Sequence, residues 1–242
     1  GKLEFEHVTF SYEKGVEILK DVNFSVEPGK TIAFVGPTGA GKSTIVNLIS
    51  RFYNVDSGRI LIDGVDISKV TLRSLRKQMG VMMQDSFIFG GTIMDNIRYG
   101  NKTATDEEVI RAAKTVCAHD FIMQMEDGYQ TQVNERGSRL SVGQRQLISF
   151  ARALLADPAI LILDEATSSI DTETEIVLQE GLNHLLKGRT SFIIAHRLST
   201  IQNADCIMYI SDGGIAEAGT HEELLQKHGK YYELYEAQYK SV

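Results

Sequence analysis

The amino-terminal part of the chain alternates between apolar and polar positions. Two runs, Leu3 to Phe10 and Ile18 to Val26, space their apolar side chains among polar neighbours. Such alternation predicts β-strands with one buried face, and the short breaks between the runs predict turns. We therefore expect an antiparallel β lobe formed by residues 1–30 and about 58–70.

Later segments are compact apolar runs of strand length. Thr31 to Val35 precedes a helical pattern over Lys42 to Arg51, and three further runs follow: Ile160 to Leu163, Ser191 to Ala195 and Ile207 to Ile210. Strands that are apolar along their whole length are typical of a sheet covered on both faces, and their alternation with helices favours a parallel sheet. The pattern predicts an α/β fold with a mainly parallel sheet.

The helices have recognisable start and stop signals. Between about 85 and 157 the pattern is mainly helical, and a further helix runs from about Thr172 to Lys187 and ends at Gly188. A tight turn is expected at 212–214. Three capping-box pairs mark helix starts: Thr105 with Glu108, Ser141 with Gln144, and Thr220 with Glu223.

These elements predict one domain over residues 1–242. A chain of 242 residues with 43% hydrophobic content is long enough to bury a full core. The expected parts are the antiparallel β lobe, a core of 31–57 and about 71–84, an inserted helical lobe of about 85–157, and a stretch of core and C-terminal helices over 158–242.

Composition restricts the partners. A net charge of −7 gives no general attraction to nucleic acid or anionic lipid. Two cysteines, Cys117 and Cys206, are too few for a disulfide framework, which favours a reduced, cytosolic compartment. No apolar run approaches the ~20 residues of a membrane span. The chain starts at Gly1, without a secretory signal, and we interpret it as a piece of a longer protein.

Residues 36–43, with the sequence GPTGAGKS, fit the phosphate-loop pattern G-x-x-x-x-G-K-[ST] without a mismatch. The glycines let backbone N–H groups turn toward phosphate oxygens at a helix N-terminus. Lys42 is expected to reach the β- and γ-phosphates, Ser43 to give its hydroxyl to Mg²⁺, and Thr44 to assist at the α/β end. An ordinary glycine turn is the weaker alternative. The loop alone does not separate a GTPase, a kinase and an ATPase.

Three candidate polar groups follow the ends of buried strands. Asp164 and Glu165 come directly after an apolar strand, where ligands gather in an open α/β sheet. Asp164 is expected to hold Mg²⁺, and Glu165 to accept a proton from the attacking water. His196 follows the next strand and is a candidate donor to the γ-phosphate that also orients Glu165 or the water. A turn-capping role for the carboxylates and a merely hydrogen-bonded histidine are the structural alternatives.

Weaker signals come from isolated residues. Gln84 offers an amide oxygen to Mg²⁺ or the attacking water. Tyr12 precedes the phosphate loop and offers a ring for stacking on a base, although a half-buried strand tyrosine is equally consistent. Residues 140–144, with the sequence LSVGQ, open a helix whose N-terminus is suited to an anion, although a simple capped helix explains them as well.

In this order the motifs resemble the nucleotide-binding domains of ABC transporters, over nearly the whole chain. The resemblance implies a P-loop NTPase with a RecA-like core, ATP and Mg²⁺ as ligands, and catalytic roles for Glu165, His196, Gln84 and Lys42. Ser43, Gln84 and Asp164 match the family's metal ligands. Residues matching its nucleotide contacts are Tyr12, Gly36, Thr38, Gly39, Gly41, Lys42, Ser43, Thr44, Gln84, Ser141, Gly143, Gln144, Asp164 and, in the D-loop 169–171, Asp171.

The resemblance also implies partners. In that family two domains sandwich two ATP molecules head to tail, so Ser141 and Gly143 of one chain would cap the phosphate bound by Lys42 of the other. Segments 87–93, 135–137 and 231–234 are similar to the exporter branch, which implies a fused or separate transmembrane domain and a place at the cytoplasmic face of a membrane. Residues 87–89 are equally consistent with core packing and with a groove for a membrane-domain helix.

Two positions depart from the family pattern: Val142 stands where the commonest signature has glycine, and Asn134 where many exporters have glycine. The bulk of Val142 affects the expected tightness of the sandwich. A DNA- or ribosome-acting ABC ATPase would be expected to carry coiled coils, zinc cysteines or tandem cassettes. A nucleotide sensor without turnover would be expected to lack Glu165. The leading hypothesis is therefore an ATP-hydrolysing motor domain of an exporter, without nucleic acid as a partner.

Overall fold

The computed structural model describes residues 1–137, 139–165 and 169–240. Its contacts divide the chain into two compact units. The first, called the sheet unit, comprises Gly1–Val81, Ala159–Glu165 and Gly188–Val242, and the second, called the helical unit, comprises Met82–Pro158 and Ala166–Lys187. Each unit is described by itself. The prediction of a single domain over 1–242 with lobes stays a prediction.

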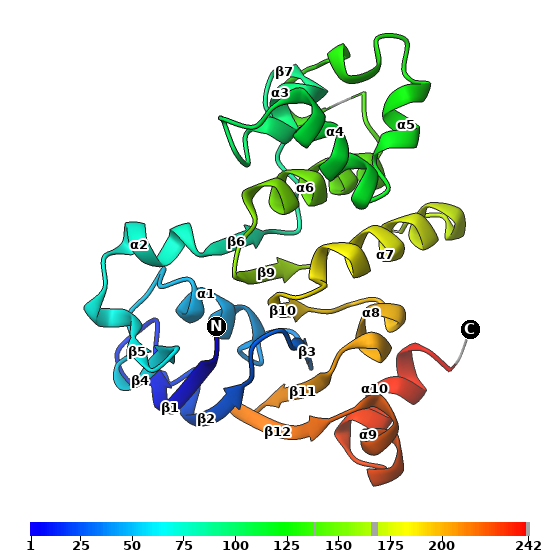
Figure 1. Ribbon diagram of the computed structural model, residues 1–242. Helices are drawn as coiled ribbons and strands as arrows, with labels where there is room; N and C mark the ends of the chain where they lie inside the picture. The colour runs from blue at the N-terminus through cyan, green and yellow to red at the C-terminus, as the bar shows by residue number, and fades with distance from the viewer. Residues whose placement is uncertain (138, 166–168, 241–242) are drawn as a thin grey trace. The chain divides into compact units, whose positions relative to one another are not determined.

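The sheet unit contains an antiparallel sheet near the N-terminus (Figure 1). Its strands are β1 (Leu3–Phe10), β2 (Leu19–Val26), β4 (Ser57–Ile62) and β5 (Val65–Asp66), in the order β2-β1-β4-β5. The apolar residues of β1 are buried at alternating positions on either side of a register shift. The antiparallel β lobe that the alternation predicts is confirmed.

A second sheet forms the core of the same unit. Its order is β12 (Gly214–Gly219), β11 (Cys206–Ser211), β3 (Thr31–Val35), β10 (Thr190–Ile194), β9 (Ile160–Asp164) and β6 (Met79–Met82). Strands β11, β3, β10 and β9 run parallel, and β12 returns antiparallel to β11. All five residues of β10 are buried, as the continuous apolar run predicts. The α/β class with a mainly parallel sheet is confirmed.

Short helices complete the sheet unit. They are α1 (Lys42–Ile49), α2 (Leu72–Lys77), α8 (Leu198–Asn203), α9 (His221–Lys227) and α10 (Lys230–Gln238), with a 3₁₀ turn η1 at Ile67–Lys69. Helix α1 buries Ile45, Val46, Leu48 and Ile49 in the same apolar cluster as Phe34 of β3. Because its apolar face is buried in this cluster, α1 begins directly after the loop that follows β3.

The helical unit consists of helices around α6 (Val142–Ala156). The others are α3 (Ile93–Arg98), α4 (Asp106–Thr115), α5 (His119–Gln124) and α7 (Thr172–Leu186), together with 3₁₀ turns η2 (Gly128–Gln130) and η3 (Glu135–Gly137) and a two-stranded pair of β7 (Gly91–Thr92) and β8 (Gln132–Val133). Helix α6 packs against α3, α4 and α7. Among the described residues, the longest helices have 15 residues, and none is long and apolar enough to span a bilayer.

All three capping boxes predicted from the sequence are present. Thr105, Ser141 and Thr220 each accept a hydrogen bond from the backbone N–H three residues on, and the side chain at that position bonds back. Thr92 and Asp95 form a further box at the start of α3. These caps satisfy backbone N–H groups that the first helical turn otherwise leaves without partners.

Candidate nucleotide-binding site

The phosphate loop connects β3 directly to α1. Its glycines Gly36, Gly39 and Gly41 have positive φ angles of 137°, 79° and 111°. Gly36 has no alternative, because a Cβ there would lie 2.3 Å from the carbonyl oxygen of Ile210 in β11. Gly39 and Thr38 are exposed at the outer part of the loop. The loop therefore has the backbone freedom and the open face that phosphate binding requires.

Lys42, the first residue of α1, folds back over the loop. Its Nζ donates to the carbonyl oxygens of Gly36 at 2.5 Å and Pro37 at 2.9 Å. Burial lowers the pKa of the Lys42 ammonium, and the nearby charge of Asp164 partly opposes this. The ammonium thus lies at the loop, with a carboxylate close enough to influence its charge.

The register of three parallel strands brings the predicted groups to one edge of the sheet. Ile194 of β10 pairs with Phe34 of β3 on one side and with Asp164 of β9 on the other. Gly36, Asp164 and His196 therefore all stand at or just beyond the carboxyl ends of neighbouring strands. This is the edge where open α/β sheets bind ligands.

Glu165 is almost completely buried, with 3% of its surface exposed, and both oxygens of its carboxylate accept hydrogen bonds. Oε2 accepts from the backbone N–H of His196 at 2.7 Å and of Arg197 at 2.8 Å. Oε1 accepts from Thr200 Oγ1 at 2.6 Å, and the Arg197 guanidinium lies 3.9 Å away. The sequence predicts that His196 orients Glu165. The contact is made by the backbone of His196.

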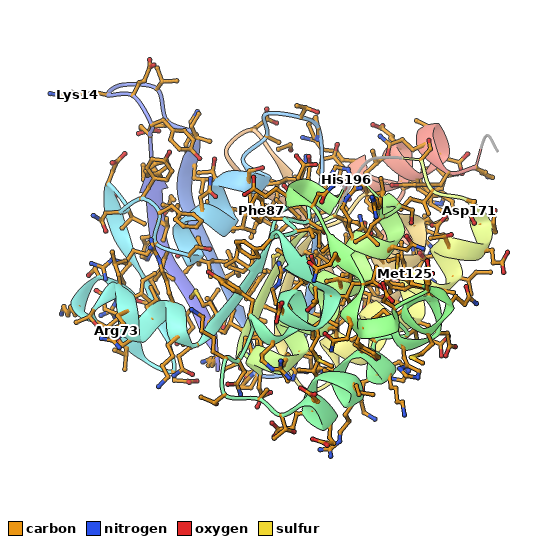
Figure 2. The ribbon with its side chains drawn as sticks, turned by 90° about the horizontal axis from the view of Figure 1, so that it is seen from above. Lys14, Arg73, Phe87, Met125, Asp171 and His196 are labelled. Carbon is orange, nitrogen blue, oxygen red and sulfur yellow. The ribbon has the colours of Figure 1, made fainter. Side chains whose placement is uncertain are left out.

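Tyr12 lies beside the loop helix with its ring accessible. The ring is 46% exposed, and the hydroxyl lies 3.1 Å from Oγ1 of buried Thr44 and accepts from Asn47 Nδ2 at 3.4 Å. Tyr53 contacts it edge to face at 4.9 Å. The turn that follows Tyr12 carries Lys14 at its tip, away from the sheet (Figure 2). A ring anchored through its hydroxyl and open on its surface is suited to stacking.

In the helical unit, the segment 140–144 forms the start of α6. Ser141 is the N-cap, and its exposed side chain accepts from Gln144 N at 3.1 Å while Gln144 Oε1 accepts from Ser141 N at 3.0 Å. A cavity of about 910 Å³ borders this start and is lined by residues of α4 to α7, including Ser141, Gly143 and Thr174. The segment 140–144 is therefore a capped helix start, as one interpretation predicts, and its N-cap residue Ser141 is exposed to solvent.

Gly143 has a packing reason to be glycine. A Cβ at this position would lie 2.4 Å from Thr174 Cγ2 of α7, far inside contact distance. The missing side chain lets the first turn of α6 lie close against α7. Val142 is half-buried at the first helical position.

Two further predicted residues belong to the helical unit. Asp171 caps α7 by accepting from Thr174 N at 2.9 Å, and the hydrogen bonds from Thr174 hold the pKa of its carboxyl below the usual value. It stands exposed at the start of that helix (Figure 2). Gln84 is exposed just after β6. The sheet unit thus brings together the phosphate loop, Tyr12, Asp164, Glu165 and His196, and the helical unit carries Gln84, Asp171 and the α6 start.

Sequence reasoning missed the groups that hold Glu165. Thr200 is buried on α8 and Arg197 directly precedes that helix, and neither forms a recognisable pattern with Glu165 along the chain. Only the neighbouring position of β9 and β10 brings the two segments together. One part of this could have been predicted: a carboxylate buried at the end of a strand requires hydrogen-bond donors, and the end of the neighbouring strand supplies them.

The fold and the loop define a nucleoside-triphosphate-binding α/β domain, and comparison with known proteins specifies it. The family model for ABC transporters matches residues 19–168. The chain is 56% identical over 239 residues to the ABC transporter ATP-binding protein YfiC of Bacillus subtilis, covering 99% of the chain and 40% of the relative. It is 52% identical over 234 residues to the fatty acid ABC transporter ATP-binding/permease protein of Mycobacterium tuberculosis, covering 97% and 37%.

A solved structure agrees with these relatives. The bacterial Atm1-family ABC exporter with ATP bound superposes with a TM-score of 0.90 at 45% identity, covering 98% of this chain and 42% of that one. The chain belongs to the ABC transporter family and is its ATP-binding domain, with the P-loop ABC ATPase fold. It spans about two fifths of the length of these relatives. Its relatives include an ATP-binding/permease protein and an ABC exporter.

Proposed function

We propose that this domain hydrolyses ATP to ADP and phosphate and thereby powers export by a membrane domain. The observation that carries the proposal is the shared edge of β3, β10 and β9, where the phosphate loop, Asp164, Glu165 and His196 lie together. Catalysis in such sites consists of positioning and charge neutralisation around the γ-phosphate. The domain supplies the residue types for both.

The nucleotide is proposed to lie along the phosphate loop. The backbone N–H groups of Thr38 to Gly41 bind the phosphates, helped by Thr44. Lys42 moves its ammonium from the loop carbonyls to the β- and γ-phosphates. The adenine stacks on Tyr12, whose ring is open to solvent. Stacking on an aromatic ring contributes about 1–3 kcal/mol by analogy with other bases.

The donor set fits Mg²⁺. No cluster of three or more His, Cys, Asp or Glu side chains in the described part of the chain is arranged to hold a metal. The cation would therefore take most of its oxygen ligands from the phosphates and water, with Ser43, Asp164 and Gln84 completing the set. Mg²⁺ bound there neutralises charge that develops on the transferred phosphoryl group.

Glu165 is proposed as the general base for the attacking water, with His196 and Gln84 positioning that water and the γ-phosphate. In the arrangement observed here both oxygens of Glu165 already accept hydrogen bonds. Because the carboxylate is also buried, base catalysis requires these contacts to change so that water can reach an oxygen when the nucleotide is bound. The donors to Glu165 lie on one short segment before and within α8, so a movement of that segment would change these contacts together.

The catalytic unit is proposed to be a head-to-tail dimer. The α6 start, with exposed Ser141, half-buried Gln144 and buried Gly143, would contact the γ-phosphate held by a second copy or a related chain. Asp171 would lie near the same junction. The solved exporter of the same fold carries bound ATP, which supports the presence of a nucleotide at this junction. Among the described residues, the hydrogen bonds of Ser141 are those of its own cap, so an anion would exchange with Gln144.

A transmembrane domain, fused or separate, is the proposed second partner, at the cytoplasmic face of a membrane. In the helical unit Ile88 is fully buried, but Phe87 and Tyr99 are 54% and 53% exposed. Arg152 stacks over the ring of Phe89 at 5.3 Å and donates to the Phe87 carbonyl at 2.9 Å. Core packing therefore explains Ile88, and the neighbouring aromatic surface is available to a partner helix.

The dimer proposal is tested by mixing two variants. Lys42→Ala removes the phosphate-loop cation, and Ser141→Ala removes the hydroxyl at the α6 start. In a mixed head-to-tail dimer both lesions fall in one site and leave the other intact, so mixing two inactive variants restores part of the ATPase activity. If each site lies within one chain, no mixture is more active than its components, and this result would count against the dimer.

A further inference from the structure

In the part of the chain that the structure describes, the segment 196–200 supplies three hydrogen bonds to the side chain of Glu165. His196 and Arg197 give their backbone N–H groups, and Thr200 gives its hydroxyl. The segment leaves the carboxyl end of β10 and enters α8. The position of this short stretch therefore decides what the Glu165 carboxylate can contact.

The observed position withdraws Glu165 from chemistry. A general base must offer an oxygen within about 2.6–3.2 Å of the water it deprotonates. Here the carboxylate is 3% exposed and both of its oxygens accept hydrogen bonds from the segment. Because the carboxylate is buried, water reaches one of its oxygens only if neighbouring groups move, and the segment 196–200 makes the contacts that would have to change.

The C-terminal helix holds that segment in place. Tyr239, which caps the end of α10, donates its hydroxyl to the carbonyl oxygen of His196 at 2.9 Å. This residue is half-buried, and its ring lies 6.3 Å from that of Tyr235. The bond joins residues 43 positions apart. The peptide group whose carbonyl accepts it donates its N–H, that of Arg197, to Glu165.

A second contact ties the same regions together. Buried His221 of α9 lies 3.3 Å from Nε2 of Gln202, near the end of α8, and 2.7 Å from the hydroxyl of Tyr231 in α10. The ring of Tyr235 packs edge-on against His221 at 5.4 Å. Helix α8 is thus held by the C-terminal helices at both of its ends.

We propose that Tyr239 is a positioning residue that holds the segment 196–200 in its withdrawn arrangement, so that the C-terminal helix restrains ATP hydrolysis until the segment is released. The inference rests on the proposed role of Glu165 as general base. It adds an element, the end of α10, which acts on the site through the backbone of His196.

The protonation state of Tyr239 suits this role. Burial raises the pKa of the Tyr239 hydroxyl, and the nearby negative charge of Glu165 raises it further. The hydroxyl therefore keeps its proton throughout the neutral range and remains a donor to the His196 carbonyl. Its electrostatic response to Glu165 also places the two groups in one local network.

Tyr239→Phe tests the proposal in the purified protein, because it keeps the ring and removes only the donor. One neutral hydrogen bond changes an equilibrium by roughly two- to tenfold. We expect kcat for ATP hydrolysis to rise by about that factor, with KM for ATP within about twofold of the wild type. Tyr232→Phe is the matched control, since Tyr232 lies on α10 with its ring against His228, and it should leave kcat unchanged.

Two further variants keep the outcome interpretable. Gln202→Leu removes the second tie and should raise kcat by a smaller factor, which covers the case in which Tyr239→Phe fails to fold. An unchanged or lower kcat in the folded variants overturns the proposal. The double variant Tyr239→Phe with Glu165→Gln should be as inactive as Glu165→Gln alone, because the increase acts through Glu165.

The same series separates the two levels of inference. If Glu165→Gln hydrolyses ATP at nearly the wild-type rate, the proposed role of Glu165 as general base is wrong. If Glu165→Gln is inactive and Tyr239→Phe has wild-type kinetics, only the restraining role of Tyr239 is wrong.

Discussion

The sheet unit and the helical unit use the same kind of backbone feature, a helix N-terminus, in opposite settings. In the sheet unit, α1 follows a glycine loop whose Gly36 is fixed against β11, and Lys42 lies over the loop. In the helical unit, the capping box of Ser141 and Gln144 satisfies backbone N–H groups at the start of α6, and Ser141 is exposed. One helix start is part of a built site, and the other is a cap open to an external anion.

This difference explains why the motifs of the sheet unit indicate a site by themselves, whereas the α6 start in the helical unit does not. The carboxyl ends of β3, β10 and β9 bring the phosphate loop, Asp164 and the segment that begins at His196 together within a single unit. The α6 start offers N–H groups and a hydroxyl, without charged partners in its cap. It gains a catalytic meaning only if another chain brings a phosphate to it. The predictions below are ordered by the size of the expected effect.

Loss of the loop cation should have the largest effect. Lys42→Ala removes the ammonium that the loop holds 2.5 Å from the Gly36 carbonyl. ATP hydrolysis should fall by at least about 10²-fold, because charge stabilisation of the transferred phosphoryl group is lost. Steady-state phosphate release measures this. Lys14→Ala, an exposed lysine in the nearby turn, is the control, and equal losses in both variants would show that the effect is unspecific.

Removal of the Tyr12 ring should weaken nucleotide binding. Tyr12→Ala should raise the Kd for ATP by roughly 5- to 100-fold, in line with the ~1–3 kcal/mol of a base–aromatic stack. Tyr12→Phe keeps the ring and loses only the contacts of the hydroxyl with Thr44 and Asn47, so its Kd should stay close to the wild type. Calorimetric titration distinguishes them. Equal Kd values for Tyr12→Ala and the wild type would remove adenine stacking from the account.

Substitutions at Gly143 distinguish a packing role from an anion-binding role of this residue in the helical unit. Gly143→Ala places a Cβ 2.4 Å from Thr174 Cγ2 and should lower the free energy of unfolding by about 1–3 kcal/mol.

Thr174→Ser removes that Cγ2 atom, so the double variant Gly143→Ala with Thr174→Ser should recover most of the stability in urea unfolding. If ATPase activity recovers together with stability, Gly143 acts through packing. If stability recovers while activity remains low, its contact with the nucleotide is supported.

The smallest expected effect concerns alkaline pH. Burial and the charge of Asp120 raise the pKa of Tyr129 in the helical unit to about 12. Because this pKa lies above that of the unfolded chain, Tyr129 contributes its full stabilisation below pH 10, and the contribution is lost as the pH rises from about 10 to about 12. Urea unfolding at several pH values should show a shallower alkaline decrease for Tyr129→Phe than for the wild type. Parallel curves would contradict the assignment.

Much of this architecture could be predicted from local sequence. Apolar runs such as Thr190–Ile194 and the glycine spacing at 36–41 reflect burial and backbone freedom, which act locally. The pairs Ser141/Gln144 and Thr220/Glu223 predicted their helix starts correctly. Strand β6 was not predicted as a separate strand, because its residues are half-buried or exposed and have no regular alternation.

The site beyond these motifs depends on contacts between distant segments. The donors of Glu165 come from residues 196–200, and the Tyr239 contact with His196 spans 43 positions. No periodicity encodes such pairs, since they follow from strand order and from where α10 ends. The reason for Gly143, the methyl group of Thr174, is likewise visible only once α6 and α7 are packed.

The central claim is that the phosphate loop and the α6 start complete one site across two chains. Glu165→Gln should bind ATP without turnover and so trap the closed assembly. Light scattering of this variant should give 26.9 kDa without ATP and twice that mass with ATP. Adding Ser141→Ala should return the mass in ATP toward that of the single chain. A Glu165→Gln protein that is saturated with ATP and remains a single chain would contradict the claim.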